Sequence, residues 1–260
     1  MSEILNIISA SDKRRNLLIL LNSGPKEWDE IKAQLHVTST GMLPQVKILE
    51  EEGLIERNNR TFSLTPMGKV LTAHMAPLVQ TMEIFDKNKK FWQEHAIGAL
   101  AEELLLDIRD IGDYHIIETS NEEIFDLNPF FDGVSRSKTI RGISHIVHPR
   151  YPEFFLDLAR KGTKISLIFT PGVYKLMREK YPDALSEWLA YDTTELFVSE
   201  EDIRFSYIVT ESYFSISFFY NSGVFDSIND VTSTDQSALA FGRRIFSHYQ
   251  KRSEKVKSLD

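Results

Sequence analysis

The sequence predicts an α+β protein with an N-terminal winged helix-turn-helix, a helical linker and a C-terminal mixed-sheet α/β domain. Between residues 26 and 65, two helical patterns joined by a polar connection precede two short strand-like runs. Beyond residue 113, strand patterns alternate with helix patterns. We therefore expect a winged helix at residues 1–66, a helical linker and dimerisation region at 67–110, and a sensor or regulatory domain at 111–260.

Length and composition limit the class of protein. The chain has 260 residues, whereas a winged helix needs only roughly 70–80, so a second domain is expected. It has no cysteine, which excludes disulfides and thiolate metal sites and suits a cytoplasmic protein. No apolar run approaches the roughly 18–20 residues of a membrane span, and the first residues do not resemble a signal peptide. We expect a cytoplasmic protein without a membrane partner.

Electrostatics make a single winged helix a weak DNA binder. The net charge of the chain is −8, and residues 1–66 hold eight basic and nine acidic side chains. Phosphate contacts supply most of the affinity of DNA-binding domains, so a near-neutral module needs a second copy to bind well. The negative net charge by itself counts against a nucleic-acid role. The winged helix nevertheless predicts double-stranded DNA as a partner, and the weak charge predicts a second copy of this chain as another.

The order of elements in the winged helix is helix, turn, helix, hairpin, which places the second helix in the DNA major groove. Met42, Leu43, Val46 and Leu49 form the expected inward stripe of that helix. Pro44 fits only if the helix begins near Gly41. The expected ranges are Lys26–Leu35 and Ser39–Glu52 for the helices, and Leu54–Arg57 and Thr61–Thr65 for the hairpin.

The predicted DNA contacts come from the second helix and from the tip of the wing. Hydroxyl, amide and cationic side chains suit phosphates and base edges. The residues are Thr38, Ser39, Thr40, Gln45, Lys47, Arg57, Asn59 and Arg60.

Apolar residues recur at helical spacing through the linker, in helices expected from Met67 onward and at about Phe91–Leu106. This is more apolar surface than one small module can bury. Dimerisation accounts for it, and packing within one chain is the alternative.

The C-terminal domain combines a parallel strand pair with antiparallel strands. A strand–helix–strand pattern around Ile140–Thr170 predicts a parallel pair, and the later strands are close enough in sequence to be antiparallel. The expected strands are Tyr114–Thr119, Thr139–Val147, Lys164–Thr170, Glu195–Val198, Ile203–Val209 and Tyr213–Phe219. The expected helices are Pro152–Arg160, Gly172–Tyr181, Pro182–Tyr191 and about Asp235–Val256.

Several segments resemble one known family. They are VKILEEEGLIERNNRTFSLTPMGKVL, ISLIFTPGVY, ELFVSEEDIRFSYIVTESYFSISFFYNSGVFDSINDV and ALAFGRRIFSHYQKRSE. The chain resembles archaeal winged-helix regulators of the methanogenesis-regulator type, in which the headpiece precedes a phospholipase-D-like sensor domain. The resemblance implies an archaeal, cytoplasmic homodimer that controls transcription, and a C-terminal domain similar to half of a phospholipase D fold.

The phospholipase D signature, H-x-K-x-x-x-x-D, is degenerate in this chain. Arg204, Ser206 and Glu211 stand at its positions, so the nucleophilic His and the phosphate-binding Lys are absent and no enzyme activity is expected. A site that binds a small polar or anionic effector remains possible on one sheet face, and a solvated face is the alternative. The candidate ligand-binding residues are Arg141, Arg204, Ser206, Tyr213, Ser215 and Ser217.

No metal or cofactor site is expected. His145 and His148 lie three residues apart on an expected strand, where they would point to opposite faces. A ligand-responsive DNA-binding regulator is thus the first hypothesis. A winged helix used for protein contact without DNA binding is the alternative, and a remnant hydrolase is a third reading that the lost His and Lys disfavour.

Overall fold

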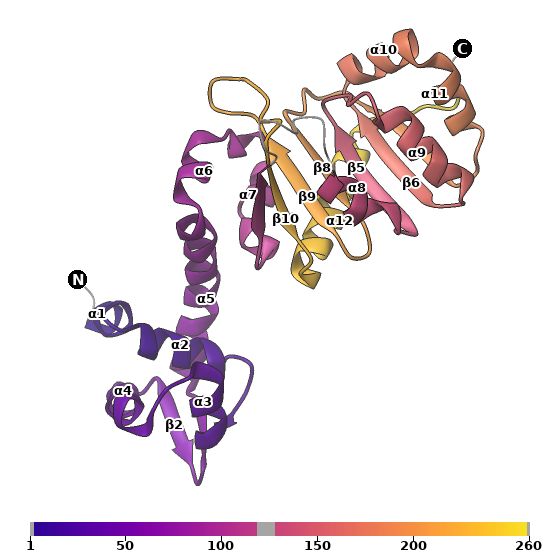
Figure 1. Cartoon of the computed structure of the whole chain (residues 1–260). Coiled ribbons are helices and arrows are strands. Elements are labelled where there is room, and N and C mark those ends of the chain that lie inside the picture. The colour runs from indigo at the N-terminus through magenta and orange to yellow at the C-terminus, as the bar shows by residue number, and fades with distance from the viewer. Residues whose placement is uncertain (1–2, 119–127, 259–260) are drawn as a thin grey trace. The chain divides into compact units, whose positions relative to one another are not determined.

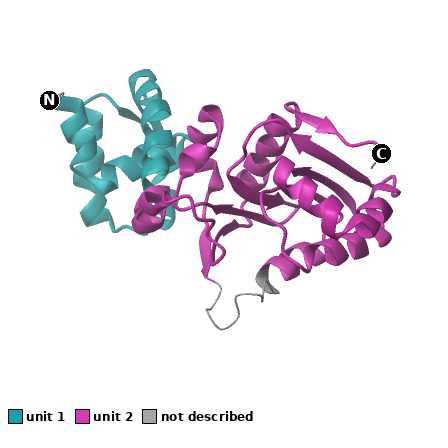
Figure 2. Cartoon of the chain, turned by 90° about the horizontal axis from the view of Figure 1, so that it is seen from above, with its two compact units in different colours: residues 1–83 teal, residues 84–260 magenta. Residues whose placement is uncertain are grey.

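A computed structural model of the chain describes residues 3–118 and 128–258 (Figure 1). The chain divides into two compact units, residues 1–83 and residues 84–260 (Figure 2). Helix α5, Pro66–Lys87, begins in the first unit and ends in the second. Residues 67–110, the expected linker and dimerisation region, are therefore shared between the two units.

The first unit has the winged helix-turn-helix arrangement that the sequence predicts. A three-stranded antiparallel sheet, in the order β1-β3-β2, packs with the helices around one apolar core. Residues 26–27, expected as the start of a helix, instead pair with β3. The elements are α1 (Glu3–Ser9), α2 (Asp12–Leu21), β1 (Lys26–Glu27), α3 (Trp28–Leu35), α4 (Ser39–Glu51), β2 (Ile55–Asn58) and β3 (Thr61–Leu64).

Local chemistry fixes the boundaries of these elements. The Ser11 hydroxyl accepts a hydrogen bond from the N–H of Arg14 at 3.4 Å and so caps α2, and Thr38 caps α4 through the N–H of Gly41 at 3.3 Å. His36 ends α3 in the left-handed region at φ 52°. This residue makes the sharp turn of the helix-turn-helix.

Helix α4 differs from the expectation in two respects. It begins at Ser39, so Pro44 lies in its second turn rather than its first. Pro44 has no N–H to donate to the carbonyl of Thr40, four residues earlier. Leu43, expected in the core, is 50% exposed. Met42 and Leu49, by contrast, are fully buried, so the inward face of α4 is narrower than the apolar pattern suggested.

The start of α5 is held against the winged helix. The Thr65 hydroxyl donates to the carbonyl of Gly53 at 2.6 Å and accepts from the N–H of Gly68 at 3.0 Å. A Cβ on Gly68 would lie 1.9 Å from the carbonyl oxygen of Leu54. Only glycine permits this approach, which fixes the first turn of α5 on the hairpin.

The second unit is built on an eight-stranded mixed sheet in the order β11-β7-β6-β5-β8-β9-β10-β4. The β5–β6 pair is parallel and the β8–β9 pair is antiparallel, as the sequence predicts. Strand β7 also pairs with β6 in parallel, which was not predicted. The strands β10 and β11 were not predicted. The strands are β4 (His115–Glu118), β5 (Thr139–Ser144), β6 (Lys164–Phe169), β7 (Thr194–Ser199), β8 (Phe205–Val209), β9 (Phe214–Phe218), β10 (Asn229–Ser233) and β11 (Ser253–Lys255).

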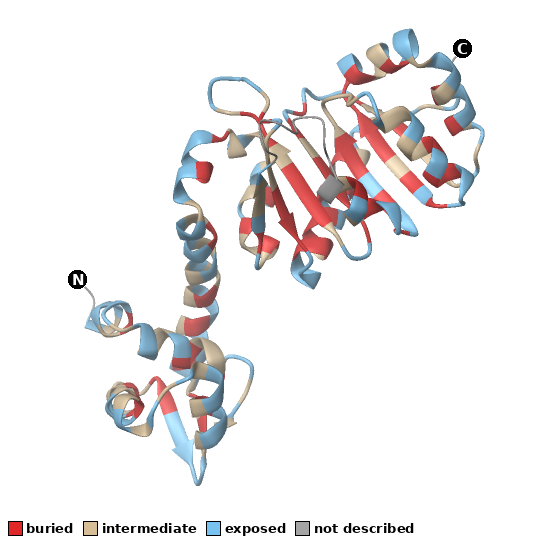
Figure 3. Cartoon of the chain, viewed as in Figure 1, coloured by how far each residue is buried: buried red, intermediate tan, exposed pale blue. Residues whose placement is uncertain are grey.

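Helices cover both faces of this sheet, and Figure 3 shows that most of its central strands are buried. On one face lie α12 and the segment from α6 to η2, and on the other lie α8 to α11. The helices are α6 (Lys89–Glu94), η1 (Ile97–Ala99), α7 (Glu102–Leu105), η2 (Ile108–Ile111), α8 (Asn128–Ser135), α9 (Tyr151–Arg160), α10 (Pro171–Lys180), α11 (Pro182–Leu189) and α12 (Gln236–Gln250).

Two of the expected helices are shorter than predicted. The single helix expected at about Phe91–Leu106 is instead the broken run α6, η1 and α7. The last helix ends at Gln250, after which residues 253–255 pair with β7. In both places the apolar residues pack on the sheet without forming one continuous helix.

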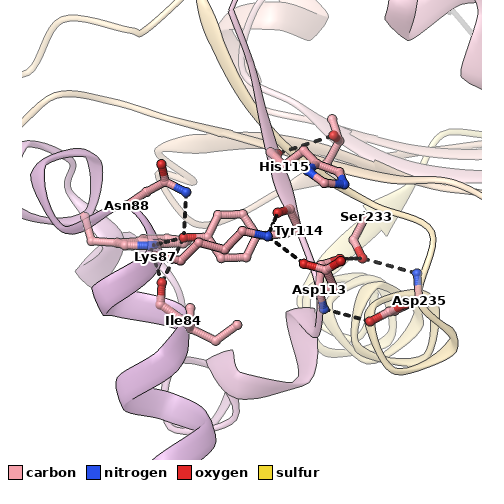
Figure 4. Close-up of polar contacts among 10 residues, drawn as sticks. Ile84, Lys87, Asn88, Asp113, Tyr114, His115, Ser233 and Asp235 are labelled. Atoms are coloured by element: carbon pink, nitrogen blue, oxygen red, sulfur yellow. Dashed lines mark hydrogen bonds and ion pairs between the residues drawn. The ribbon is translucent and has the colours of Figure 1, made fainter. Parts of the chain in front are cut away.

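A buried tyrosine joins the last turn of α5 to the sheet of the second unit (Figure 4). The Tyr114 hydroxyl donates to the carbonyl of Ile84 at 2.8 Å and accepts from Trp92 Nε1 at 2.8 Å and from Asn88 Nδ2 at 3.2 Å. Lys87 pairs with Asp113 at 2.5 Å (Figure 4), and this contact lowers the pKa of the Asp113 carboxyl.

Candidate functional site

The exposed face of α4 is a candidate DNA-reading surface. Thr40, Leu43, Pro44 and Lys47 are exposed and share one face of the helix by their spacing of three and four residues. Lys47 lies 3.6 Å from Glu51, but both side chains are mostly exposed. An exposed pair of this kind is worth only about 0–1 kcal/mol, so Lys47 can exchange Glu51 for a phosphate.

Two of the predicted DNA contacts are held inside the winged helix. Ser39 Oγ accepts a hydrogen bond from Trp28 Nε1 at 3.1 Å, and Gln45 Oε1 accepts one from Arg14 Nη1 at 2.9 Å. Both side chains are partly buried. Helical spacing did not indicate this, because the donors come from α3 and α2.

The wing tip presents one cation and uses another to hold its turn. Arg57 Nε donates to the carbonyl of Asn59 at 3.0 Å, and Asn59 takes a left-handed conformation with φ 56°. Arg60 is exposed at the tip between β2 and β3. Arg60 is thus available to a phosphate, and Arg57 supports the turn that presents it.

A cavity of about 150 Å³ lies in the second unit, between the sheet and helices α9, α10 and α11. Most of its wall is apolar, and its polar side chains gather where β8, β9 and β10 meet. The apolar part includes Phe155, Leu167, Phe169, Met177, Leu185 and Ile208. The polar part comprises Ser206, Ser215, Ser217, Ser227, Asp226 and Asp230, with Ser144 and His148 on the β5 side.

The structure brings three of the six predicted ligand residues to this cavity. Ser206 and Ser217 are direct neighbours across β8 and β9, and Ser215 lies two residues from Ser217 on the same face. One other stands apart: Arg141 lies on the opposite sheet face, where its guanidinium is 6.0 Å from the ring of Phe246 on α12.

The remaining two lie near the cavity without being part of its lining. Arg204 is exposed before β8, with its guanidinium 5.4 Å from the ring of Phe219. Tyr213 packs on Gly133 of α8. The expected cationic face is therefore not assembled here: among the described residues that line the cavity, none is arginine or lysine.

Sequence reasoning missed the two carboxylates of the cavity. Asp230 Oδ1 accepts a hydrogen bond from the hydroxyl of Ser217, and burial raises the pKa of Asp230. Burial, followed by the negative charge of Asp230, also raises the pKa of Tyr151 and of Tyr213. Asp230 lies in the short strand β10, Asn229–Ser233. The apolar pattern of the sequence did not reveal this strand, so the position of Asp230 could not be predicted.

Asp226 forms a buried ion pair with His95. The side chains are 1% and 2% exposed, and His95 Nε2 lies 2.9 Å from Asp226 Oδ2. Asp226 also accepts from the N–H groups of Ile228 and Asn229 and from Asn229 Nδ2. Burial alone would raise the pKa of Asp226, but the hydrogen bonds, led by that of Asn229, lower it overall.

Both ring nitrogens of His95 have a buried oxygen partner. Nδ1 lies 2.7 Å from the carbonyl of Phe91, and Nε2 lies 2.9 Å from Asp226 Oδ2. His95 directly follows α6, and Asp226 lines the cavity, so this pair connects the cavity wall to the segment that continues from α5.

The degenerate phospholipase positions do not form a common site. Arg204 precedes β8 and Glu211 follows it, at opposite ends of the strand. Glu211 accepts hydrogen bonds from the N–H groups of Lys138 and Thr139 at 2.7 and 3.2 Å, which tie the β8–β9 turn to the start of β5. It serves the fold of the sheet.

His145 and His148 follow the end of β5 and do not belong to it, contrary to expectation. In the part of the chain that the structure describes, no three His, Asp or Glu side chains are grouped so that they could hold a metal ion. No helix within residues 3–118 or 128–258 combines the length and apolar character of a membrane span.

Both units match known domain families. Residues 127–252 match the family described as "Methanogenesis regulatory protein FilR1, middle domain", and residues 3–87 match the "HVO_A0261 N-terminal domain". The chain is similar to a regulatory protein. Methanogenesis regulatory protein FilR1 of Methanothrix harundinacea (strain 6Ac) is 21% identical over 257 residues, which cover 97% of this chain and 58% of the relative.

The matched family describes a regulatory protein and not an enzyme, in agreement with the expectation from the degenerate signature. The chain spans 58% of the length of that relative. None of these matches supports the expected relation to phospholipase D. The structure does contain the mixed sheet that was expected for the C-terminal domain.

Two solved structures show a likeness to this chain. TrmBL2, an archaeal chromatin protein whose structure shows a novel mode of DNA binding, matches with a TM-score of 0.44 and 11% identity, over 93% of this chain and 92% of that chain. Quinone-bound YodB from B. subtilis matches with a TM-score of 0.27 and 28% identity, over 33% of this chain and 93% of that chain.

Replacing His95 by Ala should lower the free energy of unfolding of the second unit by about 3–5 kcal/mol, because it leaves the buried Asp226 carboxylate without its His95 partner. Replacing Glu94 by Gln, which removes an exposed pair with Lys90 at 3.9 Å, should cost less than about 1 kcal/mol. Urea unfolding followed by circular dichroism measures both. Equal effects would contradict the assignment of a buried ion pair.

Asp226 also predicts a pH dependence. The pKa of Asp226 is lower in the folded state than in the unfolded chain, where it has the ordinary Asp value of about 4. The ionised carboxylate therefore contributes its full stabilisation of the fold above about pH 4, and this contribution is lost as the pH falls through the lower pKa of the folded state. The stability difference between the wild type and Asp226→Asn should therefore shrink below about pH 4. A difference that stays constant or grows there would show that Asp226 is not ionised in the fold.

Proposed function

We propose that the protein is a transcriptional regulator that binds double-stranded DNA as a homodimer and responds to a small molecule bound in its second unit. The observation that carries the proposal is that one chain combines a winged helix with a domain that matches a regulatory family. The winged helix has an exposed α4 face and an exposed Arg60 at the wing tip. A winged helix places these two elements on adjacent grooves of one duplex.

The DNA contacts follow from which side chains are exposed. Lys47 and Thr40 on α4 face the major groove, and Arg60 contacts the backbone beside it. Thr38 and Asn59 lie at the edges of this surface, and Arg57, Ser39 and Gln45 act by shaping it. Leu43 and Pro44 would contact apolar groups such as the thymine methyl.

Homodimerisation is supported by an exposed apolar stripe on α5. Met67, Val70, Leu78 and Met82 are between 43% and 60% exposed, and their spacing places them with His74 on one side of the helix. A stripe of this kind is typical of a helix that packs against a partner helix. Two copies would double the cations on one operator, which offsets the near-neutral charge of each winged helix.

The same helix supports a route for the response. Its last turn is bonded to Tyr114, and the segment that follows contains His95, which pairs with the cavity residue Asp226. A bound molecule changes DNA affinity only if it binds one arrangement of the two winged helices better than another. The linker from Met67 to Leu106 is the element proposed to carry that difference.

Arg60→Ala should weaken binding to an operator fragment and lower the slope of log affinity against log salt by about 1 per subunit. Lys47→Ala should also weaken binding and should change the ranking of operator variants. Lys161→Ala removes an exposed cation from the second unit and is the matched control. Mobility shifts across a salt series on fragments of the protein's own upstream region measure all three.

The alternative, a winged helix used for protein contact, makes the opposite forecast. If no fragment shifts at low salt, with or without cell extract, while the protein still captures a partner that the Lys47 and Arg60 variants also capture, DNA binding is excluded.

Leu78→Glu should convert the dimer into a monomer, because it places a charge in the centre of the apolar stripe. Gln80→Glu introduces the same charge on the opposite side of α5 and should leave the dimer intact. Sedimentation velocity of the full chain gives the mass of each species. A monomeric wild type, or a dimer that tolerates Leu78→Glu, would refute the role of the stripe.

A further inference from the structure

The cavity of the second unit has a chemical polarity that indicates what it binds. Its body is lined by aliphatic and aromatic side chains of α9, α10, α11 and β6, and its carboxylates lie at one end, on the segment from Asp226 to Asp230. These two carboxylates are not equivalent. Asp226 is paired with His95, whereas among the described residues Asp230 has no cationic partner.

Asp230 is therefore a cavity carboxylate that no cation among the described residues pairs with. The Ser217 hydroxyl donates to its Oδ1, and no described residue donates to its Oδ2. Asp226, Tyr151 and Tyr213 interact with Asp230 electrostatically, and none of these three supplies positive charge. His148 also lines the cavity, on the β5 side. Carboxylates that lie in apolar surroundings are as a rule paired with a cation or a metal.

The surroundings of Asp230 supply further acceptors. Ser206 and Ser217 face each other across β8 and β9, and Ser215 lies two residues from Ser217. All three line the same cavity as Asp230. An ammonium group has three N–H donors and no acceptor, which matches one carboxylate oxygen and two hydroxyls. A carboxylate or phosphate ligand would meet like charge here and find no arginine or lysine in the lining.

Volume limits the size of the ligand. The cavity measures about 150 Å³, and an apolar cavity of that volume accommodates a benzene-sized molecule. The indole N–H of Trp188 also lacks an acceptor among the described residues, but it is shielded below the cavity surface, so a ligand does not reach it.

We propose that this cavity binds a small primary amine with an apolar, benzene-sized body, and that its ammonium group pairs with Asp230. The body lies among the side chains of α9 to α11, and the serines of β8 and β9 accept the remaining N–H groups. This inference rests on the proposed function, because it names the class of the effector, and it replaces the polar or anionic effector expected from the sequence.

The test compares three probes of one shape on the full chain: benzylamine, benzyl alcohol and benzoate. Isothermal titration calorimetry at neutral pH should show benzylamine binding about tenfold or more tightly than benzyl alcohol, and benzoate binding more weakly than either. No measurable binding of benzylamine, or binding of benzoate at least as tight as that of benzylamine, overturns the proposal.

Variants assign the contact to Asp230. Asp230→Asn should cost benzylamine about tenfold or more in affinity and leave benzyl alcohol nearly unchanged. Asp192→Asn, an exposed carboxylate between α11 and β7, should change neither. Ala184→Leu, which fills the apolar end, should abolish binding of both, with folding checked by circular dichroism. An unchanged benzylamine affinity in Asp230→Asn overturns the assignment.

Mobility shifts with and without benzylamine separate this inference from the proposed function. DNA binding without amine binding refutes the amine site alone. Amine binding by a protein that never binds DNA refutes the regulator and leaves the site in place.

Discussion

The buried ion pair between His95 and Asp226 is the interaction on which the second unit depends. Asp226 is held by four hydrogen bonds, and it lines the cavity while pairing with the residue that follows α6. Burying these two side chains away from water is costly, and the hydrogen bonds to Asp226 offset that cost. The contact between His95 and Asp226 therefore depends on those hydrogen bonds remaining in place. The position of the segment between α5 and the sheet is therefore tied to the shape of the cavity wall.

The distribution of cations explains why the expected anion site does not form. Alternate residues of a strand share a face, which is why Arg204 is expected beside Ser206, and Arg141 is a further candidate for the same pocket. Arg141 alternates with Gly142, and it is Gly142 that faces the cavity. Arg204 lies before the first residue of β8, where its side chain reaches solvent over Phe219. The serines remain, and the charge beside them is negative.

Local patterns predicted the elements well, and the contacts between elements less well. The winged helix, the parallel pair β5–β6 and the β8–β9 hairpin follow from periodicity and turn residues in single stretches of sequence. The exposure of Leu43, the hydrogen bond from Arg14 to Gln45 and the place of Asp230 depend on residues distant in the chain. No periodicity encodes those contacts, so the candidate DNA-reading surface was only partly predictable and the acidic side of the cavity was not.

The central claim is that the winged helix of a dimer reads DNA. The most direct test is to sequence the genomic fragments that the protein retains. The account predicts enrichment of an inverted repeat whose half-sites lie about 34–36 Å apart, or a multiple of that distance. Retention of fragments without any common motif, or of no DNA at all at low salt, would contradict it.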